Sequence, residues 1–251
     1  MVVLEVGINH FGSLSEANYY LNFFLKSNFK YLTFQIQTES FYKKFSKKIN
    51  FELPVEFYLS AIKKSKNKNK KIGLAVCDVN SFKKYEELNF DFYKLLGISI
   101  NNYKLIDILS LKKKEIFISL AKGTDKKIYN CIQRFNCKNK LRLIYTSMSY
   151  EPKDLNLNRI SYLKKKFKIP VGYGHHYKDE TPMFCAKTFG IPFIFLYIKN
   201  FNKSNRKFPD DQHAFFIKDL NILLNKIRCV DIFLKNSKIN TKIKINDKIR
   251  F

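Results

Sequence analysis

Eight times along the chain, a short apolar run is followed by a longer amphipathic stretch. The short runs are rich in β-branched and aromatic residues and are apolar almost throughout, which is the pattern of parallel strands covered on both faces. The longer stretches carry apolar residues at helical spacing. The expected strands are residues 2–8, 31–36, 72–77, 92–96, 116–120, 141–145, 171–173 and 193–198, and the expected helices are 15–26, 54–65, 81–88, 104–111, 125–135, 157–167, 180–189 and 214–234.

This alternation predicts an α/β fold, a single-domain (β/α)8 TIM barrel, because eight strand–helix units close into such a barrel and about 250 residues suffice for it. A doubly wound open sheet is the alternative, but no glycine-rich dinucleotide-binding fingerprint follows the first run. We expect the barrel domain to span residues 1–234. Residues 235–251 alternate lysine and isoleucine, and we expect a basic C-terminal tail there, with an exposed strand as the alternative.

The net charge of +26 raises the question of a nucleic-acid partner. Only six of the 47 basic residues are arginine, however, the residue that makes bidentate contacts with phosphate and guanine. We therefore expect no specific binding of nucleic acid, and we interpret the lysine excess as AT-rich codon drift.

Several features of the sequence predict a cytoplasmic protein. The five cysteines are widely spaced and form no CxxC pair, as expected of reduced thiols. The N-terminus reaches the carboxylate of Glu5 too soon for a signal peptide. The longest uncharged apolar run, residues 191–198, is too short to span a membrane.

Glu5 is a charged residue inside the otherwise apolar first strand, and Lys94 is one inside the fourth. A charge in a buried strand requires a partner or a ligand. Glu5 could pair with a neighbouring lysine, or it could face the barrel mouth and bind substrate. In a barrel of this kind, functional groups lie at the C-terminal ends of the strands, so we expect the chemistry at that end.

All four histidines fall in segments that follow the apolar runs, and these segments resemble motifs of the sialic acid synthase family. That family joins phosphoenolpyruvate to an N-acetylated amino sugar. The resemblance covers about residues 2–230. The segments are Leu-Glu-Val-Gly-Ile-Asn-His-Phe-Gly at 4–12, Thr-Phe-Gln at 33–35, Val-Gly-Tyr-Gly-His-His at 171–176 and Phe-Pro-Asp-Asp-Gln-His at 208–213.

The resemblance implies that Glu5 is a catalytic residue. It aligns the catalytic aspartate of the family with Gln212, and Asp211 is the alternative one residue earlier. It also implies a divalent metal, manganese, held by His176 and Asn200. The substrate-binding residues that it implies are Asn9, Gln35, Lys94, Ser119, Tyr150 and His213.

Five positions depart from the family pattern and put turnover in question. Thr33 stands where the family has a lysine for phosphoenolpyruvate, and Gly97 and Gly174 stand where it has hydroxyl side chains. Asn200 replaces a histidine ligand of the metal, and Gln212 replaces a carboxylate, which a glutamine cannot match in proton transfer.

Two functions therefore stay open. The first is a diverged synthase that condenses phosphoenolpyruvate with an N-acetylated hexosamine to form a nonulosonic acid. The second is a catalytically impaired barrel that binds an amino sugar or a partner protein. The sequence also ends before the small antifreeze-like domain that follows the barrel in many members of the family, so we expect a homodimer or a separate chain that supplies this part.

Overall fold

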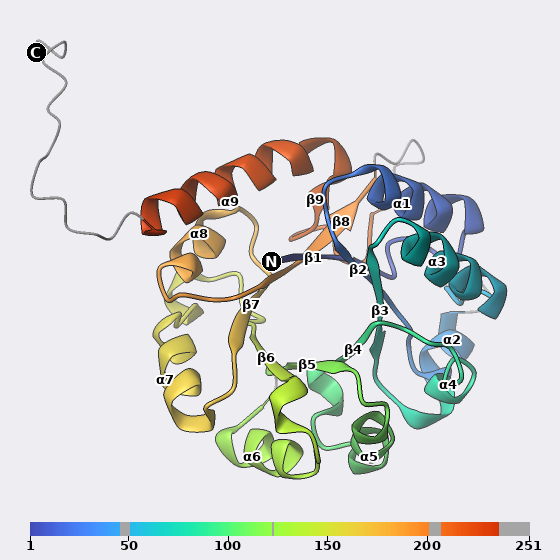
Figure 1. Ribbon diagram of the computed structural model, residues 1–251, viewed down its shortest axis with the longest axis horizontal. Helices are drawn as coiled ribbons and strands as arrows, with labels where there is room; N and C mark the ends of the chain where they lie inside the picture. The colour runs from blue at the N-terminus through green and yellow to red at the C-terminus, as the bar shows by residue number, and fades with distance from the viewer. Residues whose placement is uncertain (46–50, 122, 201–206, 236–251) are drawn as a thin grey trace, which may run out of the picture.

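The computed structural model describes residues 1–45, 51–121, 123–200 and 207–235. Eight parallel strands form a closed barrel in which each strand pairs with the next one along the chain and β8 pairs with β1 (Figure 1). The predicted (β/α)8 barrel is thus confirmed. The strands are β1 (Val2–Gly7), β2 (Tyr31–Gln35), β3 (Lys71–Val76), β4 (Phe92–Leu95), β5 (Glu115–Ser119), β6 (Leu141–Tyr145), β7 (Val171–His175) and β8 (Ile194–Lys199).

Helices surround this barrel on the outside (Figure 1). The α-helices are α1 (Leu14–Lys26), α2 (Glu39–Phe45), α3 (Val55–Asn67), α4 (Val79–Lys83), α5 (Tyr103–Leu111), α6 (Asp125–Gln133), α7 (Asn158–Phe167), α8 (Thr181–Lys187) and α9 (Leu220–Lys235). Short 3-10 helices are η1 (Gly97–Ser99), η2 (Lys138–Lys140), η3 (Pro152–Asp154) and η4 (Ile217–Asp219).

Two of the predicted helices were partly wrong, and one helix was missed. The helix expected at residues 81–88 ends at Lys83 and is followed by a series of turns. In these turns the Tyr85 hydroxyl donates a hydrogen bond to the carbonyl of Leu53. The first residues of the helix expected at 214–234 instead form β9 (Phe215–Phe216), which pairs with β8, because this tertiary pairing overrides helix propensity. Helix α2 was not expected from the apolar pattern.

The interior of the barrel has a dry end and a polar end. Side chains alternate along a strand, so Val3 and Glu5 on β1 share the inward face, as do Phe92 and Lys94 on β4. The N-terminal end of the interior is filled by one apolar cluster, and the inward charges lie beyond it, toward the C-terminal ends of the strands. The buried members of the cluster are Val3, Phe92, Phe117, Ile144, Phe193 and Phe195.

The turn from α1 into β2 is held by a buried lysine. Lys70 donates from its ammonium to the carbonyls of Phe24, Ser27 and Phe29, at 2.6, 2.6 and 2.7 Å. These carbonyls lie at and just beyond the C-terminal end of α1, where the helix dipole favours a cation. The contact fixes the entry into β2 at the N-terminal end of the barrel.

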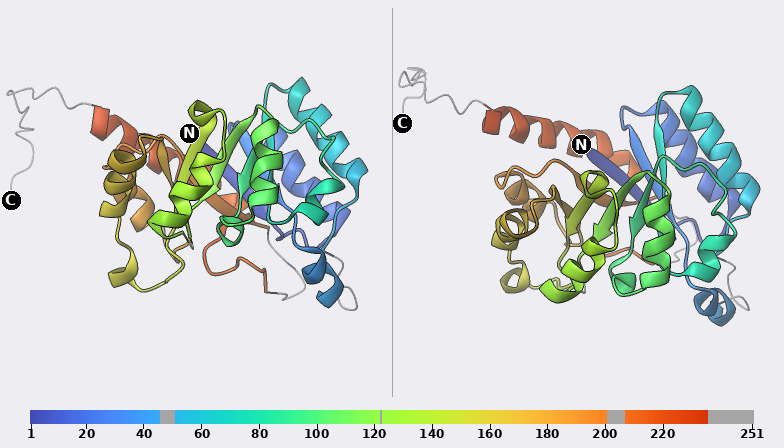
Figure 2. Two further views of the ribbon diagram at one scale, coloured as in Figure 1. Left: turned by 90° about the horizontal axis from the view of Figure 1, so that it is seen from below. Right: turned by 60° about the horizontal axis from the view of Figure 1, so that its bottom comes forward.

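The polar end and the N-terminal end of the barrel face in opposite directions. In both views of Figure 2 the N-terminus lies at one end of the barrel and α2 lies at the other end. Of the predicted basic tail, residues 236–251 lie outside the described residues. Within the described ranges, no helix is long and apolar enough to cross a membrane.

Candidate active site

Glu5 and Lys94 form a buried ion pair inside the barrel. The Lys94 ammonium lies 2.5 Å from each carboxylate oxygen of Glu5, and the two side chains are 6% and 1% exposed, respectively. The partner of Glu5 is thus Lys94, a charged residue that the sequence also places inside an apolar strand. Because each of the two charges compensates the other, removal of either would leave a buried charge alone.

A second carboxylate, that of Asp210, lies above the end of β1. Gly7 has a φ of +57°, and a Cβ there would come within 2.7 Å of Asp210 Oδ2 and of Tyr197 Cε1. Only glycine therefore lets the carboxylate and the tyrosine ring approach the backbone so closely. Burial, and next the negative charge of Glu5, raise the pKa of Asp210 to about 7, against the opposing effect of Lys94.

Asn9 fixes the segment that carries Asp210. Its amide nitrogen donates to the carbonyl of Ile198 at 2.9 Å, and its amide oxygen accepts from the backbone N–H of Asp210 at 3.2 Å. The side chain is fully buried. Asn9 was expected to bind substrate, but in the structure both ends of its amide are engaged by the backbone. Asn9 therefore positions Asp210, and its role in substrate binding stays a prediction.

Two neutral imidazoles lie beside this carboxylate. The rings of His176 and His213 stack with their centroids 4.2 Å apart, and both meet the ring of Tyr197 edge-on. The Tyr150 hydroxyl lies 2.9 Å from His213 Nδ1. Burial lowers the pKa of His213 to about 4 and that of His176 well below its usual value. Both rings are therefore uncharged at neutral pH and can exchange hydrogen bonds with a substrate.

The adjacent histidines His175, the last residue of β7, and His176 point to different neighbours. The ring of His175 packs against Phe215 and Tyr173, whereas His176 faces His213. Successive side chains of a strand point to opposite faces, and β7 extends through His175 rather than ending at Tyr173 as expected. The two rings therefore have different neighbours, and of the two only His176 stacks on His213.

The residues expected to hold a metal have different neighbours. Asn200 donates from its amide to Glu16 of α1 at 3.3 Å, and its backbone N–H donates to the Tyr20 hydroxyl. His176 stacks on His213 instead. Among the described residues, no three His, Cys, Asp or Glu side chains come together as a metal-binding group. The donors in this arrangement do not fit a manganese ion, and the metal stays a prediction.

The other expected catalytic positions, Asp211 and Gln212, lie at the edge of the cluster. Asp211 accepts from the Lys199 ammonium at 2.9 Å through a carboxylate oxygen, and at 2.7 Å through its backbone carbonyl. Gln212 is exposed. Of the substrate-binding candidates, Gln35 is the half-buried last residue of β2, and Ser119 is the buried last residue of β5.

Hydroxyl groups stand beside both glycines that depart from the family pattern. A Cβ on Gly97 would lie 3.3 Å from Ser119 Oγ, and a Cβ on Gly174 would overlap Thr146 Oγ1. Ser119 at the end of β5 and Thr146 directly after β6 thus supply hydroxyls near the places where the hydroxyl side chains were expected. Thr146 was not singled out in the sequence. It directly follows β6, and this position at a C-terminal strand end is the signal that could have identified it.

Asp210 and Tyr197 were also missed. Tyr197 stands two residues after the inward Phe195 on β8, so the alternation of the strand could have placed it in the site. Asp210 belongs to a run of three polar residues, 210–212, and nothing local distinguishes the residue that turns inward.

The closed barrel carries its buried ion pair at the C-terminal end, together with the other polar groups of the site. This is the end at which (β/α)8-barrel enzymes bind small molecules, so the fold and the site are of that class. The match to the NeuB family model covers residues 18–238, and the chain belongs to the NeuB family. It is also 24% identical over 243 residues to an uncharacterised protein of Methanocaldococcus jannaschii, a match that covers 93% of this chain and 71% of the relative.

Solved structures share the fold at low sequence identity. The N-acetylneuraminic acid (sialic acid) synthetase of Leptospira borgpetersenii serovar Hardjo-bovis, solved in complex with citrate, superposes with a TM-score of 0.83 at 20% identity, covering 96% of this chain and 87% of that one. The spore coat polysaccharide biosynthesis protein spsE of Bacillus subtilis gives a TM-score of 0.79 at 20% identity, covering 94% and 69%. At such identities the likeness shows the fold.

Proposed function

We propose that this chain is a sugar-biosynthesis enzyme of the sialic acid synthase type. The specific reaction that we propose is the condensation of phosphoenolpyruvate with an N-acetylated hexosamine, such as N-acetylmannosamine, to form a nonulosonic acid. Membership of the NeuB family supports the type of activity. The observation that carries the proposal is the buried Glu5–Lys94 pair with Asp210 beside it at the barrel mouth.

Lys94 can act as a buried cation for an anionic substrate. In the structure Glu5 neutralises it, and a phosphate or carboxylate group of phosphoenolpyruvate can take the place of Glu5. This exchange keeps the ammonium paired, as a buried charge requires. Glu5 is then released toward the sugar, where its carboxylate can accept hydrogen bonds from hydroxyl groups.

Asp210 fits the role of the proton carrier. When carbon 3 of phosphoenolpyruvate attacks the aldehyde carbon of the open-chain sugar, the aldehyde oxygen takes up a proton. Water then adds to carbon 2, loses a proton, and phosphate leaves. A carboxyl group with a pKa of about 7 is present in both protonation states at neutral pH, so it can donate the first proton and accept the second.

The test is phosphate release from phosphoenolpyruvate by the purified chain, with a panel of N-acetylated hexosamines. Parallel reactions with added manganese and with EDTA test the expected metal. The variants are Glu5→Ala, His176→Ala and Asp210→Asn, with Asp211→Asn as the matched control for Asp210. We expect release that depends on the sugar and falls at least about a hundredfold in Asp210→Asn, the loss typical of a missing general acid–base, while Asp211→Asn retains activity.

The opposite results would change the proposal in defined ways. Equal loss in Asp211→Asn and Asp210→Asn would remove the specific role of Asp210. No release by the folded chain with any sugar would exclude the synthase proposal for the chain alone. Binding of a hexosamine without release, measured by calorimetry and lost in Glu5→Ala, would favour the sugar-binding barrel instead.

A further inference from the structure

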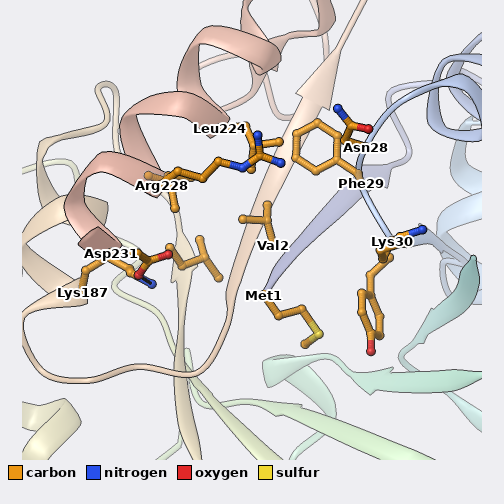
Figure 3. A pocket seen from close by; sticks show the side chains of 12 residues that line it. Met1, Val2, Asn28, Phe29, Lys30, Lys187, Leu224, Arg228 and Asp231 are labelled. Atoms are coloured by element: carbon orange, nitrogen blue, oxygen red, sulfur yellow. Dashed lines mark ion pairs between the residues drawn. The ribbon is translucent and has the colours of Figure 1, made fainter. Parts of the chain in front are cut away.

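A pocket opens at the N-terminal end of the barrel, on the side away from Glu5 and Lys94. Its volume is about 360 Å³, within the usual range of small-molecule sites. It lies between α9, the turn from α1 into β2, and the first residues of β1 and β8 (Figure 3). Its apolar lining is formed by Val2, Phe29, Tyr31, Ile194, Leu224 and Ile227.

The charges around this apolar lining are unbalanced. Lys187 and Asp231 neutralise each other across 2.5 Å. Lys30 and Arg228 also line the pocket, and neither has an ion-pair partner among the described residues. Figure 3 shows the Arg228 side chain extended from α9 toward the ring of Phe29, with Lys30 on the opposite side of the pocket.

An arginine fork above an apolar surface selects for a particular kind of ligand. The planar guanidinium makes two parallel hydrogen bonds to a carboxylate, and Lys30 adds a second positive charge at the rim. The apolar lining in turn favours a ligand with an apolar body, because binding removes that surface from water. A neutral apolar molecule would leave Arg228 unused, and a small inorganic anion would leave the apolar lining uncovered.

We propose that this pocket binds a small carboxylate with an apolar body, such as an aromatic or branched aliphatic acid, at a site separate from the candidate active site. The proposal does not rest on the proposed synthase activity. Val2 and Ile194 line the pocket and pair with each other at the start of β1 and β8, while Glu5 and Tyr197 pair three residues further along the same two strands. The two sites are therefore built on the opposite ends of shared strands.

Phenylacetate is a suitable probe, and phenylacetamide is its neutral control of the same shape. Binding of each to the full chain is measured by calorimetry and by saturation-transfer NMR. We expect saturable binding of phenylacetate and binding at least about tenfold weaker for phenylacetamide, the effect of removing a charge-assisted hydrogen bond. Excess phosphoenolpyruvate should leave the binding of phenylacetate unchanged, because the two ligands use different ends of the barrel.

Two variants and one control variant locate the bound probe. Arg228→Met removes the charge of an exposed side chain, and Lys235→Met, on the same helix but outside the pocket, is its matched control. Leu224→Trp fills the pocket without changing its charge. We expect Arg228→Met to weaken the binding of phenylacetate about tenfold, Leu224→Trp to abolish it, and Lys235→Met to leave it intact.

Each contrary result would overturn the proposal. Absence of saturable phenylacetate binding, equal binding of the acid and the amide, or equal loss in Lys235→Met and Arg228→Met would exclude a carboxylate site at this pocket. Displacement of phenylacetate by phosphoenolpyruvate would indicate that phenylacetate binds at the active-site end of the barrel and not in this pocket.

Discussion

Replacement of Asp210 by asparagine should stabilise the folded protein at neutral pH. Asparagine has nearly the same shape as aspartate but carries no charge. In the folded chain the carboxylate of Asp210 is destabilised by burial and by the negative charge of Glu5 nearby. The unfolded chain exposes this carboxylate to water, so ionisation of Asp210 favours unfolding, and Asp210→Asn removes that contribution.

The size of the effect follows from the pKa. The pKa of Asp210 rises from 3.8 to about 7 on folding. Each pKa unit corresponds to about 1.4 kcal/mol, so the full effect is about 4 kcal/mol. Below a pH of about 4, Asp210 is protonated in both states and the two proteins differ little; between about pH 4 and pH 7 only the unfolded chain ionises, and the wild type loses stability relative to the variant. Above about pH 7 the difference stays constant.

The assay is urea unfolding of wild type and Asp210→Asn at a series of pH values, with the free energy of unfolding compared at each. The lowered pKa values of His176 and His213 affect both proteins in the same direction, so their contribution largely cancels in the difference. Asp211→Asn is the control: it loses the part-exposed ion pair with Lys199, which is worth about 1 kcal/mol or less. A difference between wild type and Asp210→Asn that does not grow with pH, or a variant less stable than wild type at about pH 8, would refute the reasoning.

Three further predictions concern buried contacts and are tested by urea unfolding. Glu5→Gln and Lys94→Met should each destabilise the chain by about 3–5 kcal/mol, and the double variant should lose less than the sum, since it leaves no unpaired charge; additive losses would contradict the pairing. Lys70→Met should cost about 2–4 kcal/mol, because three carbonyls lose a charged donor, and a loss comparable to that of an exposed lysine would contradict it. Gly7→Ala should cost at least about 2 kcal/mol through its positive φ and the contacts a Cβ would make, and near-neutral behaviour would mean that this strand end is free to move.

The fold could be predicted from the sequence because its signal is local. A strand covered on both faces is apolar along its whole length, and that pattern is readable in each run without knowledge of the others. The same pattern made Glu5 and Lys94 visible, since each is a charge within such a run. Their mutual pairing was not predictable, because it depends on how far each strand is displaced along its neighbours around the closed barrel.

The part of the site after β8 depended on contacts between distant residues. Asp210 turns inward because Asn9 binds its backbone and Gly7 leaves room for its carboxylate. Neither residue is near Asp210 in the sequence. The order of the polar residues 210–212 therefore does not indicate which of them turns inward. The alternation along β7, by contrast, was readable, and a longer strand there would have separated His175 from His176.

The closure of β8 on β1 also determines when the site can form during synthesis. The hydrogen bonds from Asn9 to Ile198 and from Asp210 to Asn9 join residues 189 and 201 positions apart. Contacts of such high sequence separation form late, after the loop between them has been ordered. A chain still attached to the ribosome can order its first strands and helices, but Glu5 stays in a half-built barrel until the last strand emerges. The site is therefore among the final features to assemble, and it can form only after the whole barrel has been completed.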